Sequence, residues 1–389
     1  MLRILHIVPS YLPARRYGGT IFAVHGLCKA LAKRGHEVHV FTTNVDGNAD
    51  SNVPINRPID VEGVKVWYFP SMYFRRLYYS PLMQKALKER IKDFDLLHLH
   101  SIYLWPTWAA ACAAKHTGVP YIVSPRGMLI RELIERKSRL LKSLWIRFIE
   151  KKTLEGAAAI HMTSELEARE AEVFNFRLRR VFVIPNGVDY KPLNSQQITS
   201  EVSSNIKETL KTKPFILFLG RINWKKGLDR LIPALSYVPD AHLVIAGNDE
   251  DNYTGVLDQL ARTHKVHNRI SFIGPVYDQD KVALLKEAAV FVLPSYSENF
   301  GNTVLEAMAV GCPVVVTPEV GIAQVVKDAG AGLVVEGDPK ILGESIAKLL
   351  ADTSERQRMG KSGQKTVQEQ FTWDVVAKQM ENAYHQILS

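Results

Sequence analysis

Two glutamates, Glu298 and Glu306, flank a short segment that contains a glycine. The candidate binding residues of this segment are Asn299, Phe300, Gly301, Asn302, Thr303 and Val304, and Leu305 completes it. A glycine loop that leads into a helix start offers backbone N–H groups and the positive end of the helix dipole, which together bind phosphate. The carboxylates on either side can accept hydrogen bonds from hydroxyl groups. This order of residue types predicts a site for a sugar, a diphosphate and a nucleoside, although a glutamate in a first helical turn is also a common capping residue.

Basic residues and glycines stand at two other expected strand ends. Arg221 follows the apolar stretch 215–219, and Lys226 precedes the next helix. Gly18 and Gly19 follow the first apolar stretch at a helix start, where glycine lets the backbone approach a ligand or simply forms a loop. Because parallel sheets bind ligands beyond the carboxyl ends of their strands, we expect these groups at a ligand crevice.

Short apolar stretches alternate with amphipathic ones along the whole chain, which is typical of β-α units on parallel sheets. The expected strands are 3–8, 37–42, 64–69, 95–99, 120–124, 158–162, 181–184, 215–219, 242–246, 269–273, 289–293, 313–316 and 332–335. A chain of 389 residues exceeds one ordinary domain. The polar stretch 191–213 is the expected connection between two domains, 1–193 and 194–370. We therefore predict an α/β protein with two doubly wound, Rossmann-like parallel-sheet domains that face each other across a cleft.

Four motifs in order along the chain resemble those of glycosyltransferase family 4, and the resemblance covers nearly the whole sequence. They are Gly18-Gly19, the stretch 184–189 (Ile-Pro-Asn-Gly-Val-Asp), the stretch 220–227 (Gly-Arg-Ile-Asn-Trp-Lys-Lys-Gly), and the paired glutamates with the following stretch 309–316. Members of this family are retaining enzymes of the two-domain GT-B architecture. The resemblance also implies that a C-terminal helix, 371–389, crosses back onto the first domain.

The resemblance implies a role for each motif residue. Arg221 and Lys226 would stabilise the leaving nucleoside diphosphate together with Gly18, Gly19 and the 299–304 segment. Glu298 would hold the sugar hydroxyls and Glu306 the ribose hydroxyls, while Val276 would lie beside the base. His100 would contact the donor sugar or the acceptor. Arg126 stands where many relatives carry histidine, and it would hold an anionic acceptor, a phosphate or a neighbouring carboxylate.

We expect no required metal and no cofactor besides the nucleotide-sugar co-substrate. His98 and His100 point to one face of an expected strand, so a metal pair is conceivable, but no carboxylate or cysteine accompanies them. Three Asp-x-Asp matches, beginning at Asp93, Asp249 and Asp278, show how little that pattern discriminates. Cations of the protein would neutralise the diphosphate in place of Mg²⁺.

The formal net charge of +9 raises the question of an anionic partner. No nucleic-acid-binding motif accompanies it, so we expect no nucleic acid partner. Basic residues interleave with apolar ones in 131–152 and with aromatic ones in 73–79, which suits an anionic membrane surface, although such stripes more often pack into a core. Three dispersed cysteines and the lack of a long apolar run predict a cytoplasmic protein that touches the inner face of the membrane at most.

The best prediction is a retaining, metal-independent hexosyltransferase that uses UDP-glucose and a glycan or lipid-linked saccharide of a surface or exopolysaccharide. GDP-mannose is the alternative donor. Three other classes of protein are possible. A glycoside hydrolase would not need the basic residues beside the diphosphate, and a nucleotide-sugar epimerase would need no acceptor. The third class is a nucleotide-sugar-binding protein without catalysis.

Overall fold

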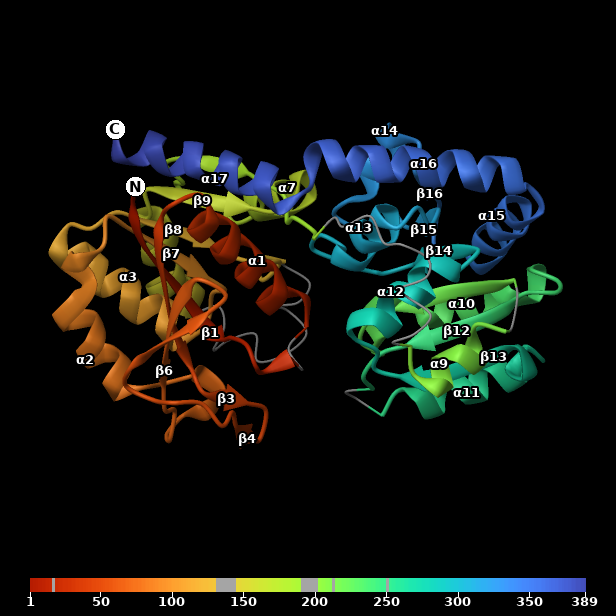
Figure 1. The fold of residues 1–389 in the computed structure, drawn as a ribbon, viewed down its shortest axis with the longest axis horizontal. Helices are drawn as coiled ribbons and strands as arrows, with labels where there is room; N and C mark the ends of the chain where they lie inside the picture. The colour runs from red at the N-terminus through yellow and green to blue at the C-terminus, as the bar shows by residue number, and fades with distance from the viewer. Residues whose placement is uncertain (16–17, 131–144, 190–201, 212–213, 250–251) are drawn as a thin grey trace. The chain divides into compact units, whose positions relative to one another are not determined.

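The computed structural model describes residues 1–389 except 16–17, 131–144, 190–201, 212–213 and 250–251 (Figure 1). The chain divides into two compact units. The first unit consists of Met1–Gly187 together with Trp373–Ser389, and the second of Val188–Thr372. Each unit has a parallel sheet covered by helices, so the predicted α/β class with two doubly wound sheets is confirmed.

The sheet of the first unit has the strand order β10-β9-β8-β7-β1-β2-β6-β5. These strands are, in chain order, β1 (Arg3–Ser10), β2 (Glu37–Thr43), β5 (Pro58–Val61), β6 (Val64–Phe69), β7 (Leu96–His100), β8 (Tyr121–Ser124), β9 (Ala159–Met162) and β10 (Val181–Val183). All neighbours pair in parallel except β5, which runs antiparallel to β6 at the edge. The order reverses between β1 and β7, where a doubly wound sheet opens a crevice.

Both faces of this sheet are buried. Leu5 and Ile7 point to one face, which is covered by α2 (Pro81–Arg90) and α3 (Trp105–Thr117). Ile4 and Val8 point to the other face, because side chains alternate along a strand. That second face is covered by α1 (Gly19–Lys33) and by α17 (Trp373–Leu388), which lies alongside α1 (Figure 1). The remaining described α-helices of this unit are α6 (Lys151–Gly156) and α7 (Glu165–Glu172).

The sheet of the second unit has the order β13-β12-β11-β14-β15-β16 and is entirely parallel. The strands are β11 (Phe215–Leu219), β12 (His242–Ala246), β13 (Ile270–Gly274), β14 (Val290–Leu293), β15 (Val314–Val316) and β16 (Gly332–Val334). The described α-helices are α9 (Ser204–Thr209), α10 (Leu228–Ala234), α11 (Thr254–Thr263), α12 (Asp278–Glu287), α13 (Asn302–Ala309), α14 (Ala323–Ala329), α15 (Pro339–Ala351) and α16 (Thr353–Gln370). The order reverses between β11 and β14, the two strands whose following loops carry the predicted donor site.

The structure differs from the sequence interpretation in three places. Three short strands were not expected, namely β3 (Val45–Asp46), β4 (Ala49–Asp50) and β5. The second unit begins at Val188, before the polar stretch 191–213, and part of that stretch folds as α9 with Ile206 in the core. Most of the amphipathic basic segment 131–152 lies outside the described residues, which resume with a π-helical turn, Ile146–Glu150, that leads into α6.

Candidate functional site

The loops that follow β11 and β14 pack directly against each other at the reversal point of the second sheet. Gly227 has a φ of +67° and lies so close to the Pro294 carbonyl that a Cβ atom would overlap it. The Tyr296 N–H donates to the Lys225 carbonyl over 2.7 Å. Doubly wound sheets bind ligands at such a reversal, so these loops form the candidate site of the second unit.

Each of the two glutamates that flank the glycine segment is paired with a lysine. Glu298 forms a close ion pair with Lys226, and both side chains are mostly buried. Glu306 Oε1 lies 2.8 Å from Lys281 Nζ. The second oxygen of Glu306, Oε2, is buried and has no hydrogen-bond partner among the described residues. Because buried polar atoms are normally satisfied, Glu306 Oε2 is placed to accept a hydrogen bond from a ligand hydroxyl.

Helix α13 begins at Asn302, within the glycine segment. Gly301 precedes it with a φ of +100°, and no side chain caps its first turn. Asn302 and Thr303 are half-buried there, and Phe300 is buried in the core. Within the 299–304 segment that was predicted to bind the diphosphate, the Val304 amide donates to the Gly301 carbonyl over 2.9 Å. The Val304 amide is therefore not available to a ligand in this conformation.

The loop after β15 fixes the backbone of Glu298 from the other side. The Glu298 N–H donates to the Glu319 carbonyl over 3.0 Å, and the Glu298 carbonyl accepts from Gly321 N–H over 2.8 Å. The neighbouring Asn299 is half-buried. Rigid support of this kind keeps a binding side chain in one place relative to the sheet.

Two further predicted donor-site residues follow strands of the same sheet. Arg221 is exposed at the end of β11. Val276 is half-buried after β13, which is two strands away from β11, and it packs against the core. No described contact joins Val276 to Glu306.

Three charged residues of this region were not predicted. Lys281 lies on α12, and its partner Glu306 is 25 positions away, so no local motif connects them. Arg230 stacks 3.5 Å from the ring centroid of Tyr296, whose hydroxyl donates to Asp229 over 2.9 Å. Arg230 lies in the first turn of α10, which begins at Leu228, whereas Lys226 ends the preceding 3-10 turn, so no helical spacing connects the two cations.

In the first unit, Gly18 and Gly19 open α1 after β1. Gly18 has a φ of +72°, which glycine adopts without strain, and no side chain caps the helix. A Cβ atom on Gly18 would meet no other atom within 4 Å. The Gly18 N–H donates to the Arg15 carbonyl over 3.1 Å, so this amide is not available to a ligand in this conformation, and the predicted phosphate contact stays a prediction.

A buried chain of hydrogen bonds links β7 and β9 to α17. His161 Nε2 lies 2.8 Å from the Ile184 carbonyl, which can only accept, so His161 carries its proton on Nε2. Its unprotonated Nδ1 then accepts from His98 Nε2 over 3.2 Å. His98 Nδ1 in turn accepts from the Tyr384 hydroxyl over 2.8 Å. Burial, together with the positive charge of Arg126, lowers the pKa of His161 to about 3, so the ring is neutral as this assignment requires.

The structure buries His100 completely and engages both of its ring nitrogens. Nε2 lies 2.9 Å from His6 Nδ1, and Nδ1 lies 3.3 Å from Arg126 Nη2. Burial holds the pKa of His100 well below its usual value. The ring has no free nitrogen to offer a sugar in this conformation, so the expected contact of His100 with substrate stays a prediction.

His6, His98 and His100 each place a ring nitrogen within 4.8 Å of the others, a spacing that could hold a metal ion. A cation there would displace hydrogen bonds of His98 and His100. It would also lie beside the guanidinium group of Arg126, and no carboxylate belongs to the described group. The chemistry of the cluster fits a neutral hydrogen-bonded network better than a metal centre.

Five carboxylates of the Asp-x-Asp matches lie among the described residues, and Asp93 lies 3.6 Å from Arg90. Asp95 accepts from the Arg3 N–H over 2.7 Å, Asp249 accepts from two amides at the start of α11, and Asp280 accepts from the Ser203 N–H over 2.9 Å. Asp278 is exposed in the first turn of α12.

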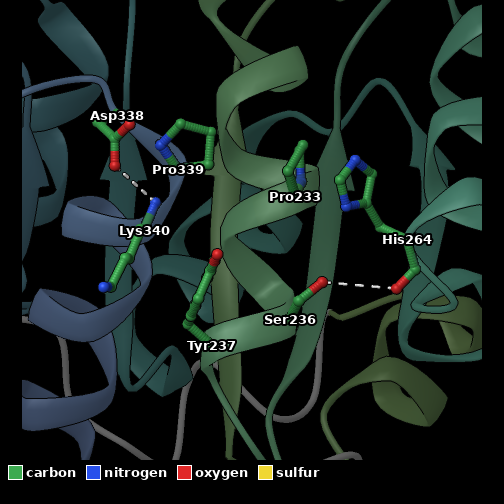
Figure 2. Close-up of a pocket in the computed structure, with 7 residues that line it drawn as sticks. All are labelled: Pro233, Ser236, Tyr237, His264, Asp338, Pro339 and Lys340. Carbon is green, nitrogen blue, oxygen red and sulfur yellow. Dashed lines mark hydrogen bonds between the residues drawn. The ribbon is translucent and has the colours of Figure 1, made fainter.

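A separate pocket of about 380 Å³ lies at the far end of α10 (Figure 2). It is lined by Pro233, Ser236, Tyr237, His264, Asp338, Pro339 and Lys340. Helix α10 begins at Leu228 beside the lysine–glutamate pairs and ends at Ala234, so this pocket lies at the opposite end of the helix from the candidate site.

Among the described residues, no helix combines the length and the apolar character that crossing a bilayer requires.

The chain is similar to known glycosyltransferases over nearly its full length. It matches the family described as Glycosyltransferase Family 4 over residues 17–191 and the family described as Glycosyl transferases group 1 over residues 200–366. An uncharacterized glycosyltransferase of Methanocaldococcus jannaschii is 28% identical over 387 residues, covering 96% of this chain and 95% of that protein. A D-inositol 3-phosphate glycosyltransferase of Xylanimonas cellulosilytica is 28% identical over 398 residues, covering 95% and 92%.

The fold is shared with solved glycosyltransferase structures. Anabaena HepE in complex with UDP and glucose superposes with a TM-score of 0.76 at 20% identity, covering 99% of this chain and all of that one. The two matched families, the two parallel sheets and the lysine–glutamate pairs at the reversal of the second sheet agree with one another. The chain belongs to glycosyltransferase family 4, with the GT-B fold.

Proposed function

We propose that the protein is a retaining, metal-independent hexosyltransferase that takes its sugar from a nucleoside diphosphate, with UDP-glucose as the first candidate donor. The observation that carries this proposal is the pair of lysine-bound carboxylates, Glu298 in the loop before α13 and Glu306 within α13. Glu306 has a buried oxygen that lacks a partner among the described residues. HepE, of the same fold, binds UDP and glucose, which supports the choice of donor.

The Lys226–Glu298 pair suggests how the site would respond to a donor. Breaking the bond between the sugar and the diphosphate adds negative charge to the leaving group. Lys226 and Arg221 would stabilise that charge, each contributing about 2.7–4 kcal/mol if the contact strengthens in the transition state. Once Lys226 bonds to phosphate, Glu298 is released to accept the sugar hydroxyls and to offset positive charge on the ring.

Glu306 would bind the ribose through Oε2, while Lys281 fixes Oε1. Val276 and the start of α13 would line the base and the diphosphate. Retention at the sugar carbon would follow from attack on the same face, with a donor phosphate oxygen taking the acceptor proton. The acceptor would be a glycan or a lipid-linked saccharide of a surface or exopolysaccharide.

Release of nucleoside diphosphate from UDP-, GDP- and ADP-sugars, with EDTA and without acceptor, tests the proposal. We expect slow release from one donor and a loss of at least about 100-fold in Glu298→Ala. Release from a GDP-sugar alone would replace UDP-glucose by GDP-mannose. A folded protein that neither releases diphosphate nor gains thermal stability with any donor would contradict the proposal.

An exposed apolar patch in the first unit supports contact with an anionic membrane surface. Met72, Tyr73, Phe74 and Leu77 are exposed in the loop before α2, at 78%, 66%, 74% and 37%. Arg76 is exposed among them, while the neighbouring Arg75 is tied to Asp50 and to the β3–β4 turn. Aromatic rings beside a free cation suit the headgroup region of a bilayer.

Flotation with vesicles tests the membrane contact. The double variant Tyr73→Ala/Phe74→Ala should lose binding to vesicles that contain phosphatidylglycerol. Val173→Ala removes another exposed apolar side chain of the same unit and serves as the control. Equal binding by all three proteins would contradict a role for the patch.

A further inference from the structure

We infer that Arg126 is an anion-recognition residue of the first unit and that it takes an oxyanion, a phosphate or a carboxylate, belonging to a substrate. The inference extends the proposed function, because that function supplies both candidate sources of the anion. They are the diphosphate of the donor and an acidic group on the acceptor.

Arg126 carries a positive charge that no carboxylate among the described residues neutralises. Its guanidinium donates from Nη1 to Asn186 Oδ1 over 2.7 Å and from Nη2 to His100 Nδ1 over 3.3 Å. Both acceptors are neutral groups. Burial lowers the pKa of Arg126 to about 10, so the group is still charged near neutral pH.

Glu167 is the carboxylate that interacts electrostatically with Arg126, and both of its oxygens already accept other hydrogen bonds. Glu167 raises the pKa of Arg126 electrostatically, but its Oε1 accepts from the Gly127 N–H over 2.6 Å. Its Oε2 accepts from the N–H and the hydroxyl of Thr163, over 2.7 and 2.9 Å. An arginine without an ion pair retains the charge and the planar fork that bind phosphate and carboxylate well.

The hydrogen bonds around Arg126 fix its position. Because a guanidinium can only donate, His100 Nδ1 must accept, and the neutral ring carries its proton on Nε2. His100 therefore donates to His6 Nδ1, which leaves the His6 proton on Nε2 without a described partner. This chain of two rings holds one edge of the guanidinium, while Asn186 holds another.

Three donors of the guanidinium are left after these two bonds. The Nε atom is buried and has no hydrogen-bond partner, and each Nη keeps one further N–H. The residue as a whole is only partly buried. Arg126 can therefore offer N–H groups from a fixed position to an oxyanion that approaches from solvent.

The backbone around Arg126 is strained where a ligand site is expected. Arg126 follows β8 with a φ of +57°, and Ser101 and Tyr103 follow the adjacent strand β7 with φ of +71° and +61°. Left-handed conformations of residues other than glycine cost free energy and gather at functional sites. These positions lie at the carboxyl edge of the sheet, next to the reversal between β1 and β7.

The test uses the full-length protein labelled with ¹⁵N-histidine and inorganic phosphate or acetate as the probe. The His100 Nδ1 resonance reports on the Arg126 contact. We expect phosphate to shift this resonance saturably in the wild type and in Lys226→Gln, in which the phosphate contact proposed for the second unit is weakened. No saturable shift in the wild type, or a shift that disappears in Lys226→Gln, overturns the inference.

Two variants separate anion binding from a structural role. Arg126→Gln should weaken the phosphate response roughly 10- to 150-fold, the range for a lost hydrogen bond to a charged group. Asn186→Asp keeps Arg126 but supplies an internal carboxylate at the position of Asn186 Oδ1, so it should also weaken the response. If Arg126 serves only to position His100, the carboxylate of Asn186→Asp would hold Arg126 more firmly and the response to phosphate would equal that of the wild type. An unchanged phosphate response in Asn186→Asp therefore overturns the inference.

Kinetics then identify the source of the anion. A higher KM for the donor in Arg126→Gln, measured as diphosphate release without acceptor, assigns the anion to the donor. An unchanged donor KM with reduced transfer assigns it to the acceptor. Variant kinetics identical to those of the wild type in both assays overturn the substrate role. A wild type that neither releases diphosphate nor gains thermal stability with any donor refutes the proposed function independently of the phosphate response at His100.

Discussion

Mild acid should destabilise the first unit, because its buried histidines can be protonated only when it unfolds. Burial, reinforced by the charge of Arg126, lowers the pKa of His6 and His161 to about 3 from 6.5. The pKa values of His98 and His100 also lie well below 6.5. The unfolded chain therefore binds more protons below pH 6.5, so this stability is complete above 6.5 and is lost as the pH falls towards 3.

The magnitude follows from these values. At pH 5.0 each histidine that stays neutral in the fold but titrates at 6.5 when unfolded lowers the free energy of unfolding by RT ln(1 + 10^1.5), about 2 kcal/mol. His6 and His161 together account for about 4 kcal/mol, and His98 and His100 add to this loss. A domain has only about 5–15 kcal/mol in total. The pKa values of Glu37 and Glu62, lowered to about 2 by their hydrogen-bonded partners, act in a lower window, below about pH 4.5.

Hydrogen exchange at pH 7.5 and 5.0, corrected for the intrinsic rates, measures this loss in β1, β7 and β9. His161→Gln should show a smaller loss between the two pH values than the wild type, by about 2 kcal/mol. The exposed His116→Gln should show the wild-type loss. If the protection of β1, β7 and β9 falls by less than about 1 kcal/mol, the burial argument is wrong. The argument is equally wrong if His161→Gln and the wild type lose the same amount.

Three further predictions concern the second unit, the packing of α17 and the metal. Glu306→Ala should raise the donor KM roughly 10-fold or more with little change in kcat, because a contact with the ribose is equally strong in the bound donor and in the transition state. An equal fall in kcat and kcat/KM would contradict this role. Gly26→Ala should lower the free energy of unfolding in urea by about 1–3 kcal/mol, because the new methyl group would overlap the Trp373 indole. Gly255→Ala, which has open space around it, should not destabilise the protein. Equal stability of the two variants would refute the packing argument. Turnover should persist after EDTA treatment, and activity abolished by EDTA and restored by Mn²⁺ would disprove the metal-independent mechanism.

The strands that carry the candidate site could be predicted because a run of neighbouring apolar residues is enough to identify each of them. The stretches 215–219 and 290–293 are short apolar runs that are buried on both faces of a parallel sheet. Strand β5 was missed because it is a half-exposed edge strand that begins with proline and lacks a continuous apolar signal. The family was predicted correctly from the glutamates and glycines at strand ends, since those residue types serve a ligand rather than the core.

The contacts around the ligand groups could not be predicted, because they join residues that are distant in the chain. Lys281 and Glu306 meet across two helices, and nothing in either local sequence specifies the pair. Tyr384 reads as one residue of an apolar helical stripe, although its hydroxyl reaches His98, 286 positions away. The sequence placed Arg126 and His100 at strand ends, but their mutual hydrogen bond depends on the register of β7 against β8.

The division of the first unit into two chain segments has a consequence for biosynthesis. Residues 188–372 leave the ribosome before Trp373–Ser389, so the second unit can complete its core while the first still lacks α17. Until then α1 covers the sheet face that carries His98 without α17, and the Tyr384–His98 bond forms only after the last helix emerges. We therefore expect nascent chains arrested before residue 373 to contain a protease-resistant second unit and a protease-sensitive first one.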